Sequence, residues 1–255
     1  MDIHSAQLSK GPLHYADIPG KLPALVVIHG FPGRPHDFKR LFPFIPSQRI
    51  IAVALPGMGI SPLHTPPYDI KGCASLVGEL LEYLELDSVH LLGHSFGATL
   101  ATFFTDKHPK KVRSLILLSS VGHRAHRIFR YSCATSLYPL TQTWGIRRCM
   151  SWVLPKLFQL LGFPKRLDYK VITQVLRLSW NFPFQDFHQS LSRINTQCLI
   201  VHAKDDPIVE YRLAEENQSL IANSRLEILD KGGHNPQVSN PETLGRWIKK
   251  MLDPN

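Results

Sequence analysis

Short apolar runs alternate with longer amphipathic stretches along most of this 255-residue chain. The apolar runs are rich in Val, Ile and Leu, a pattern typical of strands that are buried on both faces of a sheet. They predict strands near residues 24–29, 49–54, 88–93, 112–118, 197–202 and 225–229, with an N-terminal hairpin before residue 18. The amphipathic stretches predict helices near residues 36–43, 70–86, 96–108, 210–221 and 240–252. This alternation favours an α/β fold with a mostly parallel central sheet and helices on both of its faces.

A serine stands between one of these strands and the helix that follows it, in the sequence Gly-His-Ser-Phe-Gly at residues 93–97. The turn from strand to helix is so tight there that side chains two residues either side of Ser95 would collide, which explains both glycines. The turn also pushes the serine hydroxyl clear of the sheet, at the N-terminus of a helix. In this setting the pattern predicts that Ser95 is a nucleophile.

A serine nucleophile needs a base, and the base needs a carboxylate to orient it. His234 comes shortly after a predicted strand, and a preceding pair of glycines lets the backbone turn so that its imidazole can reach Ser95. Two carboxylates, Asp205 and Asp206, follow the predicted strand before that one. The three groups of a hydrolytic site are therefore present in the order serine, aspartate, histidine.

This order, with each residue just beyond the carboxyl end of a predicted strand, resembles that of α/β-hydrolases of the serine esterase type. The resemblance covers nearly the whole sequence apart from a divergent middle. It implies that Asp206 is the acid, because Ala203 occupies a small-residue position three residues before it, while Asp205 is the alternative acid or a solvated loop carboxylate. It also implies an oxyanion hole formed by the backbone N–H groups of Phe31 and Phe96.

Around this site we expect a substrate pocket. We expect it to be lined by the His-Gly pair before Phe31, by the residue before Ser95 and by two tryptophans of the divergent middle of the chain. These residues are His29, Gly30, His94, Trp144 and Trp152. The two histidines are also typical structural neighbours of such a site, so a role in packing stays open for them.

The resemblance further implies that the divergent middle, residues 123–193, is a helical lid inserted into a core formed by residues 1–122 and 194–255. Eleven of the 29 Lys and Arg residues, but only two of the 20 acidic residues, lie in this segment, so its net charge of +9 equals that of the whole chain. Because Trp and Leu are interleaved with these cations, one hypothesis is that the lid docks on an anionic lipid surface or admits acidic or lipid-like acyl substrates. The alternative is that the apolar residues pack on the core while the basic residues form a solvated rim.

Other patterns narrow the class of protein. No His-x-Glu-x-x-His spacing or Cys-His cluster is present, so we expect neither a metal nor another cofactor. No recognised nucleic-acid module accompanies the basic charge, which argues against nucleic-acid binding. The four cysteines are scattered, and we find no signal-like N-terminus and no apolar run of about 18 residues or more. We therefore expect a cytoplasmic protein, peripheral to a membrane at most, and leave its oligomeric state open.

Together these features predict a serine hydrolase that cleaves an ester-like acyl bond in a small or lipid-like substrate through an acyl-enzyme. A carbon–carbon bond hydrolase and an acyltransferase use the same order of groups and stay open, as does a non-catalytic binding protein on the same fold. Epoxide hydrolases and haloalkane dehalogenases are excluded, because they place an aspartate nucleophile where Ser95 stands. A serine would form an ether that it could not hydrolyse.

Overall fold

An eight-stranded sheet forms the centre of the protein in its computed structural model. The structure describes residues 1–58, 60–64, 68–122, 124, 138–160, 167 and 169–253. The strands are β1 (Ile3–Leu8), β2 (Gly11–Ile18), β3 (Lys21–Ile28), β4 (Gln48–Val53), β5 (Val89–His94), β6 (Val112–Leu118), β7 (Gln197–Ala203) and β8 (Ser224–Leu229). Each predicted strand and the N-terminal hairpin is present.

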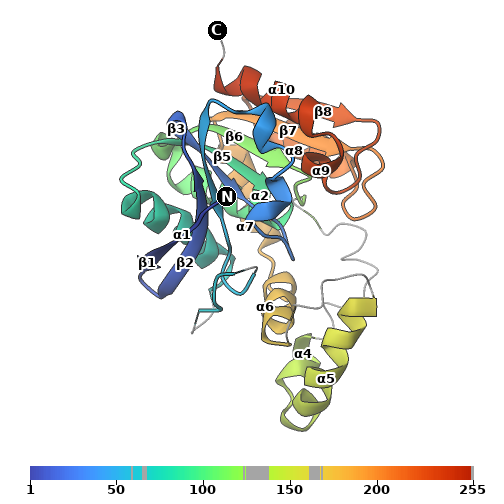
Figure 1. Ribbon diagram of the computed structural model, residues 1–255. Helices are drawn as coiled ribbons and strands as arrows, with labels where there is room; N and C mark the ends of the chain where they lie inside the picture. The colour runs from blue at the N-terminus through green and yellow to red at the C-terminus, as the bar shows by residue number, and fades with distance from the viewer. Residues whose placement is uncertain are drawn as a thin grey trace.

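The strands lie in the order β1-β2-β4-β3-β5-β6-β7-β8. Figure 1 shows β1 and β2 at one end of the sheet and β8 at the other. The first two pair antiparallel, and β2 pairs antiparallel with β4, whereas every pairing from β4 to β8 is parallel. In a parallel sheet the carboxyl ends of all strands meet at one edge. The loops that follow β3, β5, β7 and β8 therefore approach one another, although they are far apart in the sequence.

Helices connect the parallel strands and cover both faces of the sheet. The described α-helices are α1 (Ile70–Tyr83), α2 (Phe96–Lys107), α4 (Tyr138–Gln142), α5 (Trp144–Leu160), α6 (Tyr169–Trp180), α7 (Phe184–Arg193), α8 (Arg212–Leu220), α9 (Pro236–Ser239) and α10 (Pro241–Leu252). The helix predicted over 36–43 was wrong, because two short 3₁₀ helices, Pro35–Phe38 and Phe42–Phe44, occupy this stretch. Pro43 has no N–H to donate to an α-helical hydrogen bond, which disfavours a continuous α-helix through this position.

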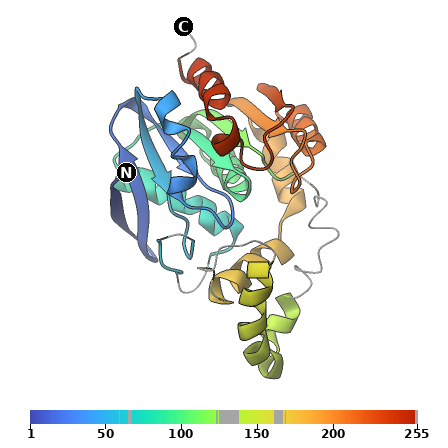
Figure 2. The same cartoon turned by 45° about the vertical axis from the view of Figure 1, so that its right-hand side comes forward.

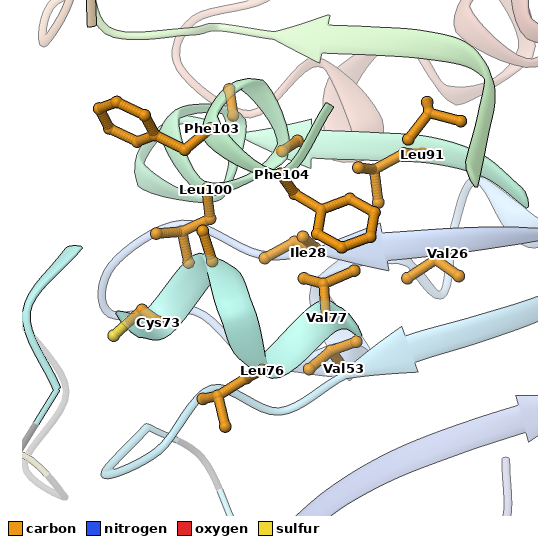
Figure 3. Packing of buried hydrophobic residues seen from close by; sticks show 14 of the residues in the cluster. Val26, Ile28, Val53, Cys73, Leu76, Val77, Leu91, Leu100, Phe103 and Phe104 are labelled. Atoms are coloured by element: carbon orange, nitrogen blue, oxygen red, sulfur yellow. The ribbon is translucent and has the colours of Figure 1, made fainter. Parts of the chain in front are cut away.

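Alternate residues of the central strands build a separate apolar core on each face of the sheet. Val26 and Ile28 of β3 belong to one core, into which α1 and α2 pack, and Figure 3 shows Val77 of α1 and Phe104 of α2 beside them. The neighbouring Val27 belongs to the other core, which α10 covers. This two-sided burial explains why the strands are apolar throughout rather than alternating with polar residues.

Helices α4, α5 and α6 form a group that projects away from the sheet (Figures 1 and 2). Their facing sides make a small apolar cluster that includes Leu154 and Phe158 of α5 and Ile172 of α6. Phe31, in the loop after β3, packs against both this cluster and the larger core. The helical group is thus anchored on the loop at the carboxyl edge of the sheet.

The assignment of residues 123–193 as a lid stays a prediction. Residues 123, 125–137, 161–166 and 168 of this segment lie outside the described residues. Within the part of the chain that the structure describes, no helix has the length and apolar character required to cross a bilayer.

Candidate active site

The turn that carries Ser95 has the sharp geometry that its glycines predict. Ser95 has a φ of 52° and a ψ of −117°, in a region that side chains with a Cβ rarely adopt, and it directly precedes the first residue of α2. A Cβ on Gly97 would overlap the carbonyl oxygen of Ile28, and one on Gly93 would overlap the backbone of α2. Helix α2 therefore starts in direct contact with the sheet, and the Ser95 side chain is held at the sheet edge.

Ser95, His234 and Asp206 form a hydrogen-bonded chain across this edge. The Ser95 hydroxyl donates to Nε2 of His234 over 2.9 Å, and Nδ1–H of His234 donates to Oδ2 of Asp206 over 2.8 Å. The side chain of Asp206 is 0% exposed and that of His234 is 9% exposed. The loops after β5, β7 and β8 thus bring together three groups that span 139 positions of the sequence.

Asp206 is held as a carboxylate by four donors. Its Oδ1 accepts the backbone N–H groups of Ile208 and Val209, and its Oδ2 accepts from His202 as well as from His234. Burial alone would raise the pKa of Asp206, but hydrogen bonds from the two histidines and the nearby charge of His234 hold that pKa well below its ordinary value of 3.8. The carboxylate stays ionised at neutral pH.

Asp205 has a different position. Its Oδ1 accepts the backbone N–H groups of Gly232 and Gly233, each over 2.8 Å, so it fixes the loop that carries His234. The geometry brings Asp206, not Asp205, to the imidazole. Sequence reasoning left Asp205 as the alternative acid or a solvated carboxylate, and it did not identify this loop contact.

His94 and His29 are buried beside the site and make structural hydrogen bonds. Nε2–H of His94 donates to the backbone oxygen of His234 over 2.7 Å, so the two loops are tied at this point. Burial, followed by the nearby His234, lowers the pKa of His94 from 6.5 to about 3, so the ring is neutral at neutral pH. Nδ1–H of His29 donates to the oxygen of Gly30, while its Nε2 accepts the backbone N–H of Leu55.

The backbone of Gly30 lies next to the serine. A Cβ on Gly30 would lie 2.8 Å from Cβ of Ser95, so only glycine allows this approach. Phe96 is the first residue of α2, and the N–H of such a residue has no acceptor within its own helix. A small cavity adjoins the Phe96 side chain, and Leu55, Tyr68 and Leu178 are among the residues that line it.

The pocket prediction for Trp144 and Trp152 does not fit the structure. Both lie on α5, where they are 94% and 65% exposed. The face of α5 that is turned toward the protein carries Leu154 and Phe158 instead, and these two side chains are buried. A helix with apolar residues on most of its circumference can bury only one face, and the tryptophans fall outside it.

The described residues also bear on metal binding. They contain no group of three or more His, Cys, Asp or Glu side chains that could hold a metal ion.

Comparisons with known proteins agree with this architecture. Residues 25–246 match the profile of the alpha/beta hydrolase family. A poly(3-hydroxyalkanoate) depolymerase from Ectopseudomonas oleovorans is 32% identical over an alignment that covers 98% of this chain and 92% of that protein. A pimeloyl-[acyl-carrier protein] methyl ester esterase from Neisseria meningitidis is 27% identical, with 92% of this chain and 96% of the relative covered.

Solved structures show the same fold at lower sequence identity. An esterase from Exiguobacterium antarcticum superposes with a TM-score of 0.77 at 22% identity, covering 97% of this chain and 98% of the other. A haloalkane dehalogenase from Bradyrhizobium elkani superposes with a TM-score of 0.78 at 19% identity, covering 98% and 97%. The chain therefore belongs to the α/β-hydrolase family and is an enzyme of that family.

Proposed function

We propose that the protein is a serine hydrolase that cleaves ester-like acyl bonds. The observation that carries this proposal is the chain of hydrogen bonds from Ser95 through His234 to Asp206, with distances of 2.9 and 2.8 Å. These distances lie within the range that proton transfer between a nucleophile and its base requires. The names of the depolymerase and the methyl ester esterase give further support, since both denote enzymes that act on esters.

The reaction proceeds in two steps. In the first, Nε2 of His234 takes the proton from Ser95 as the serine oxygen attacks the carbonyl carbon, and Asp206 stabilises the imidazolium that results. His234 then gives this proton to the leaving alcohol, and the acyl group stays on the serine oxygen. In the second step a water molecule gives a proton to the same imidazole as its oxygen attacks the acyl carbon. The bond between that carbon and the serine oxygen then breaks, His234 returns the proton to Ser95, and the acid leaves.

Two backbone donors stabilise the oxyanion in each step. We assign them to Phe31, beside the close approach of Gly30 to Ser95, and to Phe96 at the start of α2. One such donor typically contributes about 10²- to 10³-fold in rate. Because Ser95 directly precedes α2, the positive end of the α2 dipole adds to this effect.

A carbon–carbon bond hydrolase is the second candidate. A 2-hydroxy-6-oxo-2,4-heptadienoate hydrolase from Pseudomonas putida is 24% identical over an alignment that covers 80% of this chain. Transfer of the acyl group to an alcohol instead of water needs the same groups. A non-catalytic binding protein would not require a serine hydroxyl within 2.9 Å of an imidazole.

The test is hydrolysis of p-nitrophenyl esters of increasing acyl length, in parallel with a vinylogous diketone. We expect turnover of at least one ester and none of the diketone. Ser95→Ala should abolish that turnover, whereas Ser120→Ala, at a buried serine that bonds to the backbone of Val121, should keep it. Turnover of the diketone without turnover of any ester would refute the ester hydrolase and favour the carbon–carbon bond hydrolase.

We further propose that the outward face of α5 contacts an anionic lipid surface and presents the enzyme to lipid-like substrates. Trp144, Trp152 and Leu160 are all more than half exposed on this helix, and no acidic residue lies between 138 and 160. Nζ of Lys156 lies 3.4 Å from the centre of the Trp152 ring, so a cation and an indole share one patch. Exposed indoles beside cations favour the boundary between anionic headgroups and acyl chains.

Co-sedimentation with vesicles tests this contact. At low salt we expect the protein to sediment with vesicles that contain phosphatidylserine and to stay in solution with pure phosphatidylcholine. Equal binding to both vesicles, or binding to neither, would refute the lipid contact and leave the hydrolytic assignment untouched.

A further inference from the structure

A second buried histidine contacts the same carboxylate oxygen of the acid that His234 contacts. His202 lies on β7 and its side chain is 0% exposed. Its Nε2 is 2.9 Å from the backbone oxygen of Val209 and 3.1 Å from Oδ2 of Asp206. The mechanism given above uses the serine, the catalytic histidine and the acid, and it does not use this ring.

The surroundings of His202 define where its proton lies. Both neighbours of Nε2 are acceptors, a carbonyl and a carboxylate, so Nε2 carries the hydrogen and shares it between them. Nδ1 is buried and has no hydrogen-bond partner among the residues that the structure describes. The ring therefore acts as a donor to the loop that follows its own strand.

This donor completes the fixation of the carboxylate. Oδ1 of Asp206 is occupied by the N–H groups of Ile208 and Val209, and Oδ2 lies between the two histidine rings. Rotation of the carboxylate about its terminal bond would break hydrogen bonds on both oxygens. Without His202, the catalytic imidazole would be the remaining side-chain donor to Oδ2. The bond from His202 to Val209 also closes the loop from 204 to 209 onto the end of β7.

We propose that His202 is a positioning residue, which holds the Asp206 carboxylate in the plane that orients the catalytic imidazole. The proposal rests on the proposed serine hydrolase chemistry. His202 touches neither the substrate nor the reacting atoms, so its removal should lower the reactivity of Ser95 and leave substrate binding unchanged. Outer-shell residues that orient the ligands of metal sites typically contribute about 10- to 100-fold, and we expect an effect of similar size here.

The experiment compares variants that keep or remove the donor. His202→Gln places an amide N–H near the position of Nε2, His202→Asn carries the same amide on a side chain one carbon shorter, and His202→Leu has no donor. His90→Leu is the matched control, because His90 is also a buried strand histidine but bonds to Ser114 away from the site. For each variant we measure the rate of Ser95 labelling by a fluorophosphonate, kcat and KM on the best p-nitrophenyl ester, and the urea midpoint.

The expected result is a labelling rate and a kcat that fall about 10- to 100-fold in His202→Leu and His202→Asn. KM should stay within about twofold, and His202→Gln should recover most of the loss. If the loss of a buried histidine acted only through stability, His90→Leu would lose urea midpoint and kcat as His202→Leu does. An unchanged kcat in His90→Leu therefore separates a positioning role of His202 from a role in stability alone. If His202→Leu does not fold, the contrast between Gln and Asn decides.

Two outcomes overturn the inference. One is a labelling rate in His202→Leu or His202→Asn within twofold of the wild-type rate. The other is an equal loss in His202→Gln and His202→Asn. Failure of the wild-type protein to label at Ser95 is a separate result, which refutes the proposed function itself.

Discussion

The loops at the carboxyl edge of the sheet and the outward face of α5 differ most in how firmly neighbours fix their side chains. At the sheet edge, Asp206 is fully buried and accepts four hydrogen bonds from three different segments. On α5, Trp144 is 94% exposed and Leu160 is 85% exposed. The first region is suited to chemistry, which needs groups held within fractions of an ångström. The second is suited to contact with something outside the molecule.

The same contrast separates sequence features that must be kept from those that can vary. At the sheet edge several polar side chains have partners on a different segment, as His94 has in the backbone of His234 and Asp205 has in Gly232 and Gly233, so one substitution disturbs more than one loop. On α5 the exposed side chains can change with little effect on the fold.

The largest effect is expected from the adjacent aspartates. Asp206→Asn should lower kcat on an ester by about 10⁴-fold, because an amide at this position favours the wrong tautomer of the catalytic imidazole. Asp205→Asn keeps an oxygen for the N–H groups of Gly232 and Gly233, so its kcat should stay within about tenfold. Steady-state kinetics of both variants measure this. Similar losses in both would contradict the assignment of Asp206.

The next effect is on the unfolding free energy, and it compares one glycine at the sheet edge with one glycine on α5. Gly97→Ala forces a methyl group against the carbonyl of Ile28 and should cost about 4 kcal/mol of unfolding free energy. Gly145→Ala on α5 meets no atom within 4 Å and should stabilise the protein by about 0.5–1 kcal/mol, because alanine is the better helix former. Urea unfolding measures both changes. A neutral Gly97→Ala would show that the turn at Ser95 is not tight.

The third effect is on binding to anionic vesicles, which depends on the positive charge of α5. Replacing Arg147, Arg148 and Lys156 with Gln should weaken binding to phosphatidylserine vesicles by about 10²-fold, since each cation contributes about 1 kcal/mol near an anionic surface. The control replaces three exposed cations that lie outside residues 123–193, namely Lys39, Lys110 and Lys250. It should leave binding to the vesicles nearly unchanged. Sedimentation at low salt measures both. An equal loss in the control would mean that net charge, not α5, drives binding.

The smallest effect concerns pH and the buried His94. In the unfolded chain this histidine takes up a proton below its ordinary pKa of 6.5, whereas burial keeps the folded pKa at about 3. The unfolded state therefore binds more protons between these values, so stability falls as the pH is lowered through this range. From pH 6 to pH 5 wild type should lose about 1 kcal/mol more unfolding free energy than His94→Gln. Equal losses in urea titrations at the two pH values would contradict the depressed pKa.

Much of the sheet edge could be predicted from the sequence because glycines mark its turns. The glycines around Ser95 and before His234 are required by backbone geometry, so they identify the turns without knowledge of the packing. The choice between Asp205 and Asp206 is harder, since both follow the same strand. It depends on which way each side chain leaves the loop, and the contacts that decide this come from residues almost thirty positions away.

Contacts between distant segments account for the errors and omissions. The partners of His202 follow from the way the 204–209 loop folds back onto β7, which the sequence pattern does not reveal. Trp144 and Trp152 were assigned to the pocket although other residues of α5 face the protein. Apolar residues occur on every side of this helix, although cations stand among them. The pattern alone therefore does not identify the buried face. The helix over 36–43 failed for a local reason, the proline at position 43.

The most direct test of the central claim is to trap the acyl group on Ser95. Purified protein is mixed with p-nitrophenyl acetate, quenched in acid within the first turnovers and digested for mass spectrometry. We expect one added acetyl group on the peptide that contains Ser95, and none on the corresponding peptide of Ser95→Ala. Turnover of the ester with no acyl group on Ser95, or with the group on another residue, would contradict the central claim.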